Sequence, residues 1–436
     1  MLASKMAIES EGSGDPLVMP GQLLPFSLVT SLFFMWGVPN NLNDVLIRQF
    51  MTSFTLNRVE AGLVQSAFYL GYFILAIPAA LIMRRRGYKT GLVIGLLLYA
   101  TGAILFWPAA VVGRYSFFLA ALFVIASGLS FLETASNPFI TQMGSPATAA
   151  RRLNFSQAFN TLGSITGVLA GTIFIFSGVE LTPAQIAVQK AAGTYGSYLQ
   201  RETMRVVAPY LVLGCIALTL AIVFMRTRFP EVAAEESSLS PGEQGIGALF
   251  RRPHFLLAVF AQFLYVGAQV GTWSYFIQYV QDYTHQPEKH AGLFLTGTLG
   301  AFALGRFSAP ILMKRIAAAR LMLLYAVSNA VLLVYAVSQP GWAGMWAVFL
   351  TSFFMSIMFP TIFALGLEGL GSLVKLGGSL LVMAIVGGAA LTPIMGWISQ
   401  HGGIARAYSV PLVSYLVIAG FSWYHMRRGV ARAAAH

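Results

Sequence analysis

Long stretches without a single charged side chain constrain this chain most. Residues 115–132, 153–179 and 321–367 contain no Lys, Arg, Asp or Glu. About 20 consecutive apolar residues are enough to cross the hydrocarbon core of a bilayer as an α-helix. Inside the bilayer the backbone must satisfy its own hydrogen bonds, so helices rather than open strands are expected. The chain is therefore predicted to be an all-α membrane protein.

Composition agrees with this prediction. Hydrophobic residues make up 57% of the 436 residues and charged residues 10%, whereas soluble domains are about 25% charged. The net charge of +12 comes from short basic clusters between apolar stretches, a pattern typical of cytoplasmic loops, which argues against nucleic-acid binding. The single Cys215 excludes an intrachain disulfide and a cysteine metal cluster. Residues 1–20 lack the apolar core of a cleavable signal peptide.

The apolar stretches predict twelve transmembrane helices. They are expected near residues 23–47, 60–83, 90–110, 115–142, 152–178, 206–226, 253–281, 291–313, 320–338, 343–367, 376–400 and 405–426. The segment between spans six and seven is polar and contains Ser and Gly, as a linker between two halves would. The predicted organisation is a cytoplasmic N-terminal segment (1–22), a six-helix bundle (23–228), a cytoplasmic linker (229–252), a second six-helix bundle (253–426) and a cytoplasmic tail (427–436).

The distribution of basic residues predicts the orientation in the cytoplasmic (inner) membrane. With a cytoplasmic N-terminus, 18 Lys and Arg lie inside and 8 outside, and Arg306 within a span completes the total of 27. Because inside loops are the more basic ones, both termini and the linker are expected in the cytoplasm.

The two halves repeat weakly. Gly71-Tyr72-Phe73 is matched by Gly305-Arg306-Phe307, and Pro138 by Pro360. Two six-helix repeats related along the membrane normal are the plan of the major facilitator fold, whose substrate site lies between the halves near the midplane.

Polar residues inside the first-half spans are the main candidates for function, because such residues are costly in a bilayer. Asp44 lies in span one, one helical turn after Asn40 and Asn41, and Glu133 lies deeper, in span four. A buried carboxylate costs about 2.5–3.5 kcal/mol, most of which protonation removes, so both acids are candidate proton carriers. The alternatives are that Asp44 lies in water at the end of its span and that Glu133 has only a structural role.

Span five carries a polar stripe at helical spacing. It consists of Asn154, Gln157, Asn160 or Thr161, and Ser164. Such a stripe can line a substrate cavity, or it can serve only hydrogen bonding between helices.

Span seven offers the matching surface in the second half. One face carries Gln262, Tyr265, Gln269, Trp273 and Phe276. Amides bind hydroxyl groups and aromatic faces cover the C–H surface of a sugar ring, although an aromatic stripe alone also suits helix packing. Arg306 in span eight is a candidate gate residue or structural ion-pair partner.

Several motifs together resemble the L-fucose:proton symporter family. They are Asn40-Asn41-Leu42-Asn43-Asp44-Val45-Leu46, Gln65-Ser66-Ala67-Phe68-Tyr69, Leu132-Glu133-Thr134-Ala135-Ser136-Asn137-Pro138-Phe139, Arg152-Leu153-Asn154 with Gln157-Ala158-Phe159-Asn160, Tyr265-Val266-Gly267-Ala268-Gln269, Trp273-Ser274-Tyr275 and Phe359-Pro360-Thr361-Ile362-Phe363. The likeness covers about residues 23–427 and is weakest at 179–205 and 229–252.

The resemblance implies roles for particular residues. Asp44 and Glu133 match the family's two functional acids, and Asn41, Gln157 and Asn160 match its sugar-site positions. The glucose/galactose branch of the family has Gln in place of the span-four carboxylate, so Glu133 favours the fucose branch. The sequence departs from the family pattern at two positions near Asn41 and Asp44. Pro39 is expected to kink span one, and Arg48 stands where the fucose carrier has Pro.

The sequence thus predicts a secondary active transporter that imports a neutral monosaccharide, L-fucose foremost, by proton symport with alternating access. Carriers of glucose/galactose or N-acetylglucosamine and a passive sugar facilitator remain alternatives. The substrate-binding set is expected to comprise Asn41, Glu133, Gln157, Asn160, Gln262, Tyr265, Gln269 and Trp273.

No enzyme, metal site or cofactor is expected, since the sequence has no HExxH or GxGD motif and no Ser/His pair within a span. An anionic substrate would need buried cations, and Arg306 is the only candidate. The expected partners are the sugar, protons and membrane lipids, and the expected oligomeric state is a monomer.

Overall fold

The computed structural model describes residues 17–19, 21–56, 58–175, 181–229 and 246–433. The elements among these residues are all helices, and no β-strand occurs in the described ranges. The chain forms two compact units, each of which is described by itself. Unit 1 comprises Met1–Phe26, Asn137–Ala158 and Val232–His436, and unit 2 comprises Ser27–Ser136 and Phe159–Glu231.

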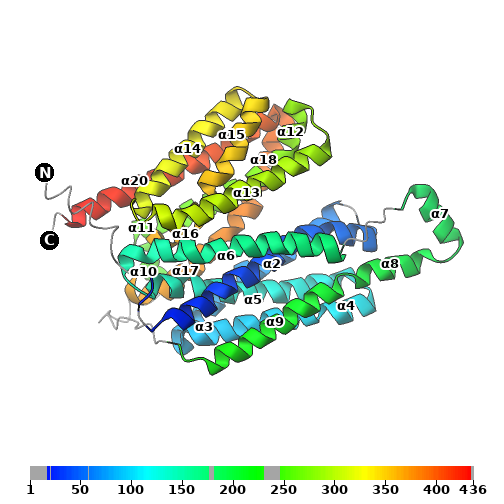
Figure 1. Cartoon of the computed structure of the whole chain (residues 1–436), viewed down its shortest axis with the longest axis horizontal. Coiled ribbons are helices and arrows are strands. Elements are labelled where there is room, and N and C mark those ends of the chain that lie inside the picture. The colour runs from blue at the N-terminus through cyan, green and yellow to red at the C-terminus, as the bar shows by residue number, and fades with distance from the viewer. Residues whose placement is uncertain (1–16, 20, 57, 176–180, 230–245, 434–436) are drawn as a thin grey trace. The chain divides into compact units, whose positions relative to one another are not determined.

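Unit 2 is built mainly from first-half helices (Figure 1). Its helices are α2 (Leu23–Ser53, from Ser27 on), α3 (Arg58–Ile104), α4 (Phe106–Val112), α5 (Tyr115–Gln142, to Ser136), α7 (Pro183–Ala191), α8 (Tyr195–Met204), α9 (Val207–Arg226) and the end of α6 (Ala149–Ala170). α3 packs along α9. Pro39 lies inside α2 and does not end it.

Glycines bring the helices of unit 2 into backbone contact. A Cβ atom on Gly37 of α2 would collide with the Asn160 carbonyl oxygen of α6, and one on Gly163 of α6 would collide with the Phe34 carbonyl oxygen. A Cβ atom on Gly71 of α3 would lie 2.8 Å from the Ala126 Cβ atom of α5. Small residues of this kind let membrane helices approach closely, which fixes the positions of the polar side chains beside them.

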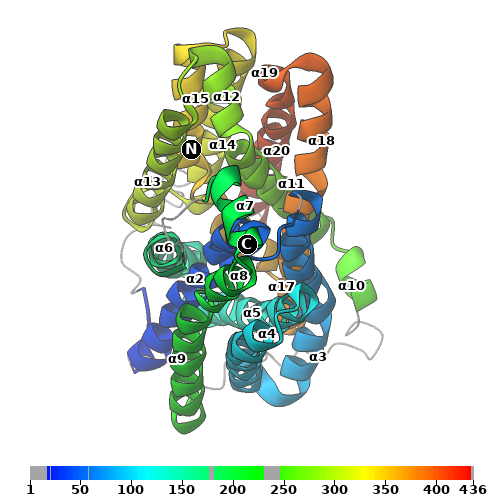
Figure 2. The ribbon, with the colours of Figure 1, turned by 90° about the vertical axis from the view of Figure 1, so that its right-hand side faces the viewer.

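Unit 1 contains the second-half helices together with the end of α5 and the first part of α6, up to Ala158. Its further helices are α10 (Ile246–Phe250), α11 (Pro253–Ser274), α12 (Phe276–Thr284), α13 (Glu288–Leu312), α14 (Ala318–Ser338), α15 (Trp342–Met355), α16 (Met358–Leu367), α17 (Val374–Met383), α18 (Gly387–Gly402), α19 (Ile404–Ala407) and α20 (Ser409–Ala433). α11 packs against α18 and α20, and α14 packs against α15 and α20 (Figure 2).

Arg152 joins α5 to α6 within unit 1. Its buried guanidinium donates hydrogen bonds to the carbonyl oxygens of Ile140 at 3.0 Å, Thr141 at 2.6 Å and Ser145 at 3.0 Å. The first two carbonyls lie at the end of α5, where a helix leaves acceptors without partners, and Ser145 lies in the turn that follows. Arg152 therefore fixes the turn that leads into the polar stripe of α6.

The helices match the twelve predicted spans. Among the described residues, ten helical segments are long and apolar enough to cross a membrane. One of them, Leu63–Val112, has 50 residues and contains a break at Gly87 (φ 78°, ψ 169°), so it supplies two crossings. α13, with 25 residues, corresponds to the remaining predicted span.

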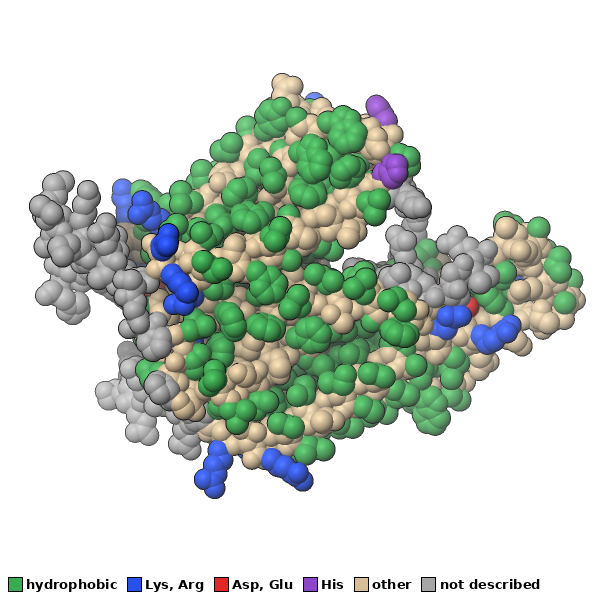
Figure 3. Space-filling view, viewed as in Figure 1, with side chains coloured by type: hydrophobic (Ala, Val, Ile, Leu, Met, Phe, Trp, Pro, Cys, Tyr) green, Lys and Arg blue, Asp and Glu red, His purple; other side chains and the backbone are tan. Residues whose placement is uncertain are grey.

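The flanks of the helices carry the surface expected against lipid. Along α14 the exposed residues Leu324, Val327, Val331 and Val334 recur every three to four positions and form one apolar stripe. Figure 3 shows hydrophobic side chains along the helix flanks and Lys and Arg side chains at helix ends. A water-soluble protein rarely exposes such continuous apolar surface.

Two helices lie between the predicted spans 152–178 and 206–226, where no helix was predicted. α7 and α8 lie within residues 179–205. α7 begins with a capping box, in which the Thr182 hydroxyl accepts from the Gln185 amide and the Gln185 side chain accepts from the Thr182 amide. This pairing satisfies two amides that a helix start leaves free.

Candidate functional site

Glu133 and Tyr72 form a buried pair within unit 2. The Tyr72 hydroxyl of α3 donates a hydrogen bond of 3.0 Å to Oε1 of Glu133 on α5. The two residues are 4% and 5% exposed. Among the described residues no Lys, Arg or His lies within salt-bridge distance of this carboxylate. An acid with a neutral partner in an apolar surrounding can exchange its proton without breaking an ion pair.

Asn40 and Asn41 are neighbours on α2. The Asn40 side chain lies near the Tyr72 hydroxyl. The half-buried Asn41 donates through Nδ2 to the Gly37 carbonyl oxygen at 3.2 Å. Asp44 lies one turn further along the helix, but its side chain is outside the described part of the structure, so its role stays a prediction.

Asn160 also contacts α2. Its Nδ2 donates to the Phe33 carbonyl oxygen at 3.2 Å, one turn before the carbonyl that Asn41 uses. The side chains of Asn41 and Asn160 are both half-buried. Unit 2 therefore brings two predicted sugar ligands to the same helix, and each retains an amide oxygen that can accept from a hydroxyl group.

Gln157 belongs to a second polar cluster, in unit 1. Its Nε2 donates to Oδ1 of Asn137 at 3.3 Å, and its Oε1 accepts from Nη1 of Arg306 at 3.0 Å. Both ends of the Gln157 amide are thus engaged. A hydroxyl group that binds Gln157 must use the second Nε2 hydrogen or the second Oε1 lone pair, or replace one of these bonds.

Arg306 is the centre of this second cluster. Its Nε donates to the Ser356 carbonyl oxygen at 2.8 Å, and its Nη1 also donates to the Gln157 carbonyl oxygen at 3.0 Å. The guanidinium lies 4.7 Å from the centre of the Phe302 ring. Tyr265 of α11 lies beside it. No acidic partner of Arg306 occurs among the described residues, so carbonyl oxygens and an aromatic face stabilise this cation.

The remaining predicted substrate-binding residues lie on α11 and differ in how deeply they are buried. Gln262 is fully buried, and neither atom of its amide has a hydrogen-bond partner within the described ranges. Tyr265 is fully buried, whereas Gln269 and Trp273 are half-buried. Trp273 donates through Nε1 to the Ser352 hydroxyl at 3.1 Å and lies edge-on to Phe302, with ring centres 5.1 Å apart.

The partners of Glu133 and Gln157 were not predicted from the sequence. In the sequence, Tyr72 and Arg306 were noted mainly as equivalent positions of the repeated Gly-X-Phe motif. In the structure Tyr72 donates to Glu133, and Arg306 donates to Gln157. The equivalent positions of the repeat thus each support a candidate site residue, and this was the signal that could have identified them.

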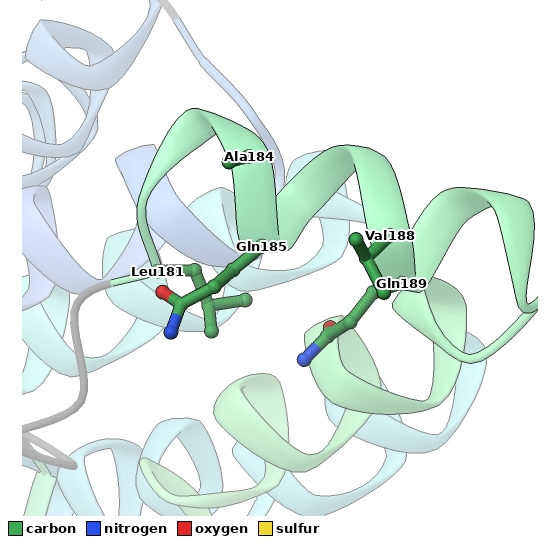
Figure 4. A pocket seen from close by; sticks show the side chains of 5 residues that line it. All are labelled: Leu181, Ala184, Gln185, Val188 and Gln189. Atoms are coloured by element: carbon green, nitrogen blue, oxygen red, sulfur yellow. The ribbon is translucent and has the colours of Figure 1, made fainter.

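A hollow of about 340 Å³ lies at α7 and is separate from these clusters (Figure 4). It is lined by Leu181, Ala184, Gln185, Val188 and Gln189, all from one short segment. None of these residues is charged or aromatic, so the hollow lacks the groups expected of a sugar site.

Comparisons with known proteins agree with the fold. Residues 26–373 match the family model of the Major Facilitator Superfamily. A crystal structure of the Major Facilitator Superfamily transporter FucP, in the outward conformation, superposes with a TM-score of 0.85 at 40% identity and covers 92% of this chain and 99% of that chain. The fold and the family model define a major facilitator carrier.

Sequence identity to named relatives identifies the family within this superfamily. The L-fucose-proton symporter of Escherichia coli is 42% identical over 403 residues, which cover 91% of this chain and 92% of the relative. The glucose/galactose transporter of Brucella abortus is 37% identical over 393 residues, with coverage of 90% and 91%. The chain belongs to the L-fucose-proton symporter family of the Major Facilitator Superfamily. It is a multi-pass inner-membrane transporter and not an enzyme.

Proposed function

We propose that this protein imports a neutral monosaccharide, L-fucose foremost, together with protons. The observation that carries the proposal is Glu133: a buried carboxylate within a membrane-spanning helix, hydrogen-bonded to a neutral tyrosine. Such a group is costly while ionised, and protonation relieves the cost. Coupling follows if the sugar-loaded carrier reorients only when Glu133 holds a proton, and the empty carrier returns after Glu133 has released it.

Candidate residues within each of the two units favour a hydroxyl-rich, uncharged substrate. Asn41 and Asn160 offer amides, and Trp273 offers an aromatic face, as sugars require. The one buried cation identified in the candidate clusters, Arg306, is already bound to Gln157 and Ser356. Three of its hydrogen bonds thus already go to oxygen atoms of the protein, which leaves less of this cation for an anionic substrate, so a neutral sugar fits better.

L-Fucose is favoured over other hexoses by two observations. The E. coli relative named an L-fucose-proton symporter is 42% identical, against 37% for the Brucella glucose/galactose transporter. In addition, position 133 carries Glu, which favours the fucose branch of the family. Glucose/galactose or N-acetylglucosamine transport and passive sugar diffusion are the alternatives that an experiment must separate.

The proposed setting is a monomer in the inner membrane with both termini in the cytoplasm. The basic clusters at Arg84–Arg86 and Arg151–Arg152 support this orientation. The exposed apolar stripe of α14 supports direct contact with lipid chains.

The test is a panel of radiolabelled sugars in proteoliposomes that contain the purified protein. Uptake of L-fucose, glucose, galactose and N-acetylglucosamine is measured with and without an inward proton gradient. The proposal expects L-fucose to be taken up fastest and to accumulate only with the gradient. Equal uptake with and without the gradient would indicate a passive facilitator, and faster uptake of another sugar would reassign the substrate.

A further inference from the structure

The pair of Tyr72 and Glu133 is held by the backbone around it and is not a chance contact. The Ser130 hydroxyl of α5 donates to the Tyr72 carbonyl oxygen at 3.1 Å, in addition to the 3.0 Å bond between the two side chains. Next to Tyr72, Gly71 has no side chain, and a Cβ atom there would lie 2.9 Å from the Phe123 carbonyl oxygen of α5. α3 and α5 are therefore in contact where the hydroxyl meets the carboxylate.

The Tyr72 ring is also fixed from its own helix. Phe68, one turn earlier on α3, lies with its ring centre 5.4 Å from that of Tyr72. Asn40 of α2 approaches the same hydroxyl. Glu133 of α5 thus accepts from the hydroxyl while Phe68 packs against the ring, so the Tyr72 side chain has little freedom to turn away from Glu133.

The chemistry of the pair depends on the protonation state of Glu133. A tyrosine hydroxyl can donate to an ionised carboxylate, and it can also accept from a protonated carboxyl group. A hydrogen bond to an ionised group is stronger than one between neutral groups. Tyr72 therefore stabilises the ionised form of Glu133 more than the protonated form, while it keeps its own proton in both states.

We propose that Tyr72 is a positioning residue for proton coupling: its hydroxyl orients the Glu133 carboxylate and sets the pH at which Glu133 releases its proton. This inference rests on the proposed proton symport and adds a residue to it. Tyr72 need not touch the sugar, because it acts through Glu133.

A second tyrosine of α3, beyond the break at Gly87, provides the matched control. Tyr99 is also on α3 and is fully buried, but its hydroxyl has no hydrogen-bond partner among the described residues. Tyr72→Phe and Tyr99→Phe therefore each remove one buried hydroxyl group from α3. Only the first removes a donor to a carboxylate.

The experiment measures the pH dependence of gradient-driven L-fucose uptake in proteoliposomes for wild type, Tyr72→Phe and Tyr99→Phe. Without the donor, Glu133 holds its proton more tightly. The pH at which uptake falls to half should then rise by about one unit for Tyr72→Phe, as expected for the loss of a hydrogen bond to a charged group. The profile of Tyr99→Phe should stay at the wild-type position.

Infrared difference spectra provide a second measurement, which would not change if Tyr72 had only a structural role. The carboxyl stretch assigned to Glu133, by its loss in Glu133→Gln, should shift in Tyr72→Phe and stay in place in Tyr99→Phe. In the Glu133→Gln background, adding Tyr72→Phe should leave the pH dependence of sugar exchange unchanged, because the titrating group is already gone.

The outcomes separate this inference from the proposed function. Wild-type protein that takes up no sugar with protons contradicts the proposed function. A coupled wild type with an unmoved pH profile in Tyr72→Phe, or an equal shift in Tyr99→Phe, overturns the role of Tyr72 alone. Should Tyr72→Phe give no folded protein, Ser130→Ala loosens Tyr72 and is expected to shift the profile in the same direction by a smaller amount; an unmoved profile there also counts against the inference.

Discussion

At the scale of single residues, the two compact units each contain one polar cluster with a distinct chemical character. In unit 2 a carboxylate, Glu133, has a neutral hydroxyl as its partner. In unit 1 a cation, Arg306, has carbonyl and amide oxygens as its partners. Neither charge forms an ion pair with another described residue, so each remains sensitive to a ligand or a proton.

Replacing Glu133 by Gln tests the acid directly. The variant imitates the protonated form, so sugar exchange should persist while accumulation driven by a proton gradient is lost. Glu202→Gln is the matched control, because Glu202 is also buried but is held by Gln49 at 3.0 Å and by Arg205 at 3.4 Å. We expect accumulation to survive in this control. Accumulation at the wild-type rate in Glu133→Gln would remove Glu133 from coupling.

Asp44 is tested by Asp44→Asn, which keeps the volume of the side chain and removes its titration. The residue lies on α2 one turn after Asn40 and Asn41. We predict near-normal expression, lost accumulation against a gradient and residual downhill exchange. Uptake and equilibrium exchange are measured as a function of pH. An unchanged pH profile with full accumulation would show that Asp44 is a solvated residue at the end of its span.

At the scale of helices, close backbone contacts place the polar side chains. Gly37 and Gly163 let α2 and α6 approach so closely that Asn160 reaches the Phe33 carbonyl oxygen. Gly71 plays the same part between α3 and α5. The geometry of the site therefore depends on residues that have no polar chemistry of their own.

Gly37→Ala is predicted to disturb this arrangement. The added methyl group would overlap the Asn160 carbonyl oxygen, and overpacking of this kind costs about 1–3 kcal/mol. We expect a lower melting temperature in detergent and weaker sugar uptake. Gly300→Ala on α13 is the control, because nothing lies within 4 Å of its added Cβ atom. Equal melting temperatures for wild type and Gly37→Ala would contradict the tight contact between α2 and α6.

At the scale of the whole molecule, the helices could be predicted from the sequence because lipid imposes a simple rule on length and polarity. The span predicted at residues 115–142 coincides with α5. The helices α7 and α8 were missed because polar helices outside the apolar spans follow no such rule. The predicted domain boundaries and the site roles stay predictions.

The candidate site could be predicted only in part. Intramembrane Glu and Asn residues are visible in sequence because they are rare in such helices. Their partners are not visible, since Tyr72 is 61 positions from Glu133, and Arg306 is 149 positions from Gln157. The complete burial of Gln262 was equally hidden, because the span-seven pattern predicted a face and not its neighbours.

Proton movement with the sugar is the central claim, and it is tested most directly by the external pH of weakly buffered cells that produce the protein. One proton that crosses 100 mV supplies about 2.3 kcal/mol, which is enough for a roughly 50-fold sugar gradient. Addition of L-fucose should therefore make the medium more alkaline, and a protonophore should abolish both this change and sugar accumulation. Accumulation that continues in the presence of the protonophore, with no change in external pH, would contradict the account.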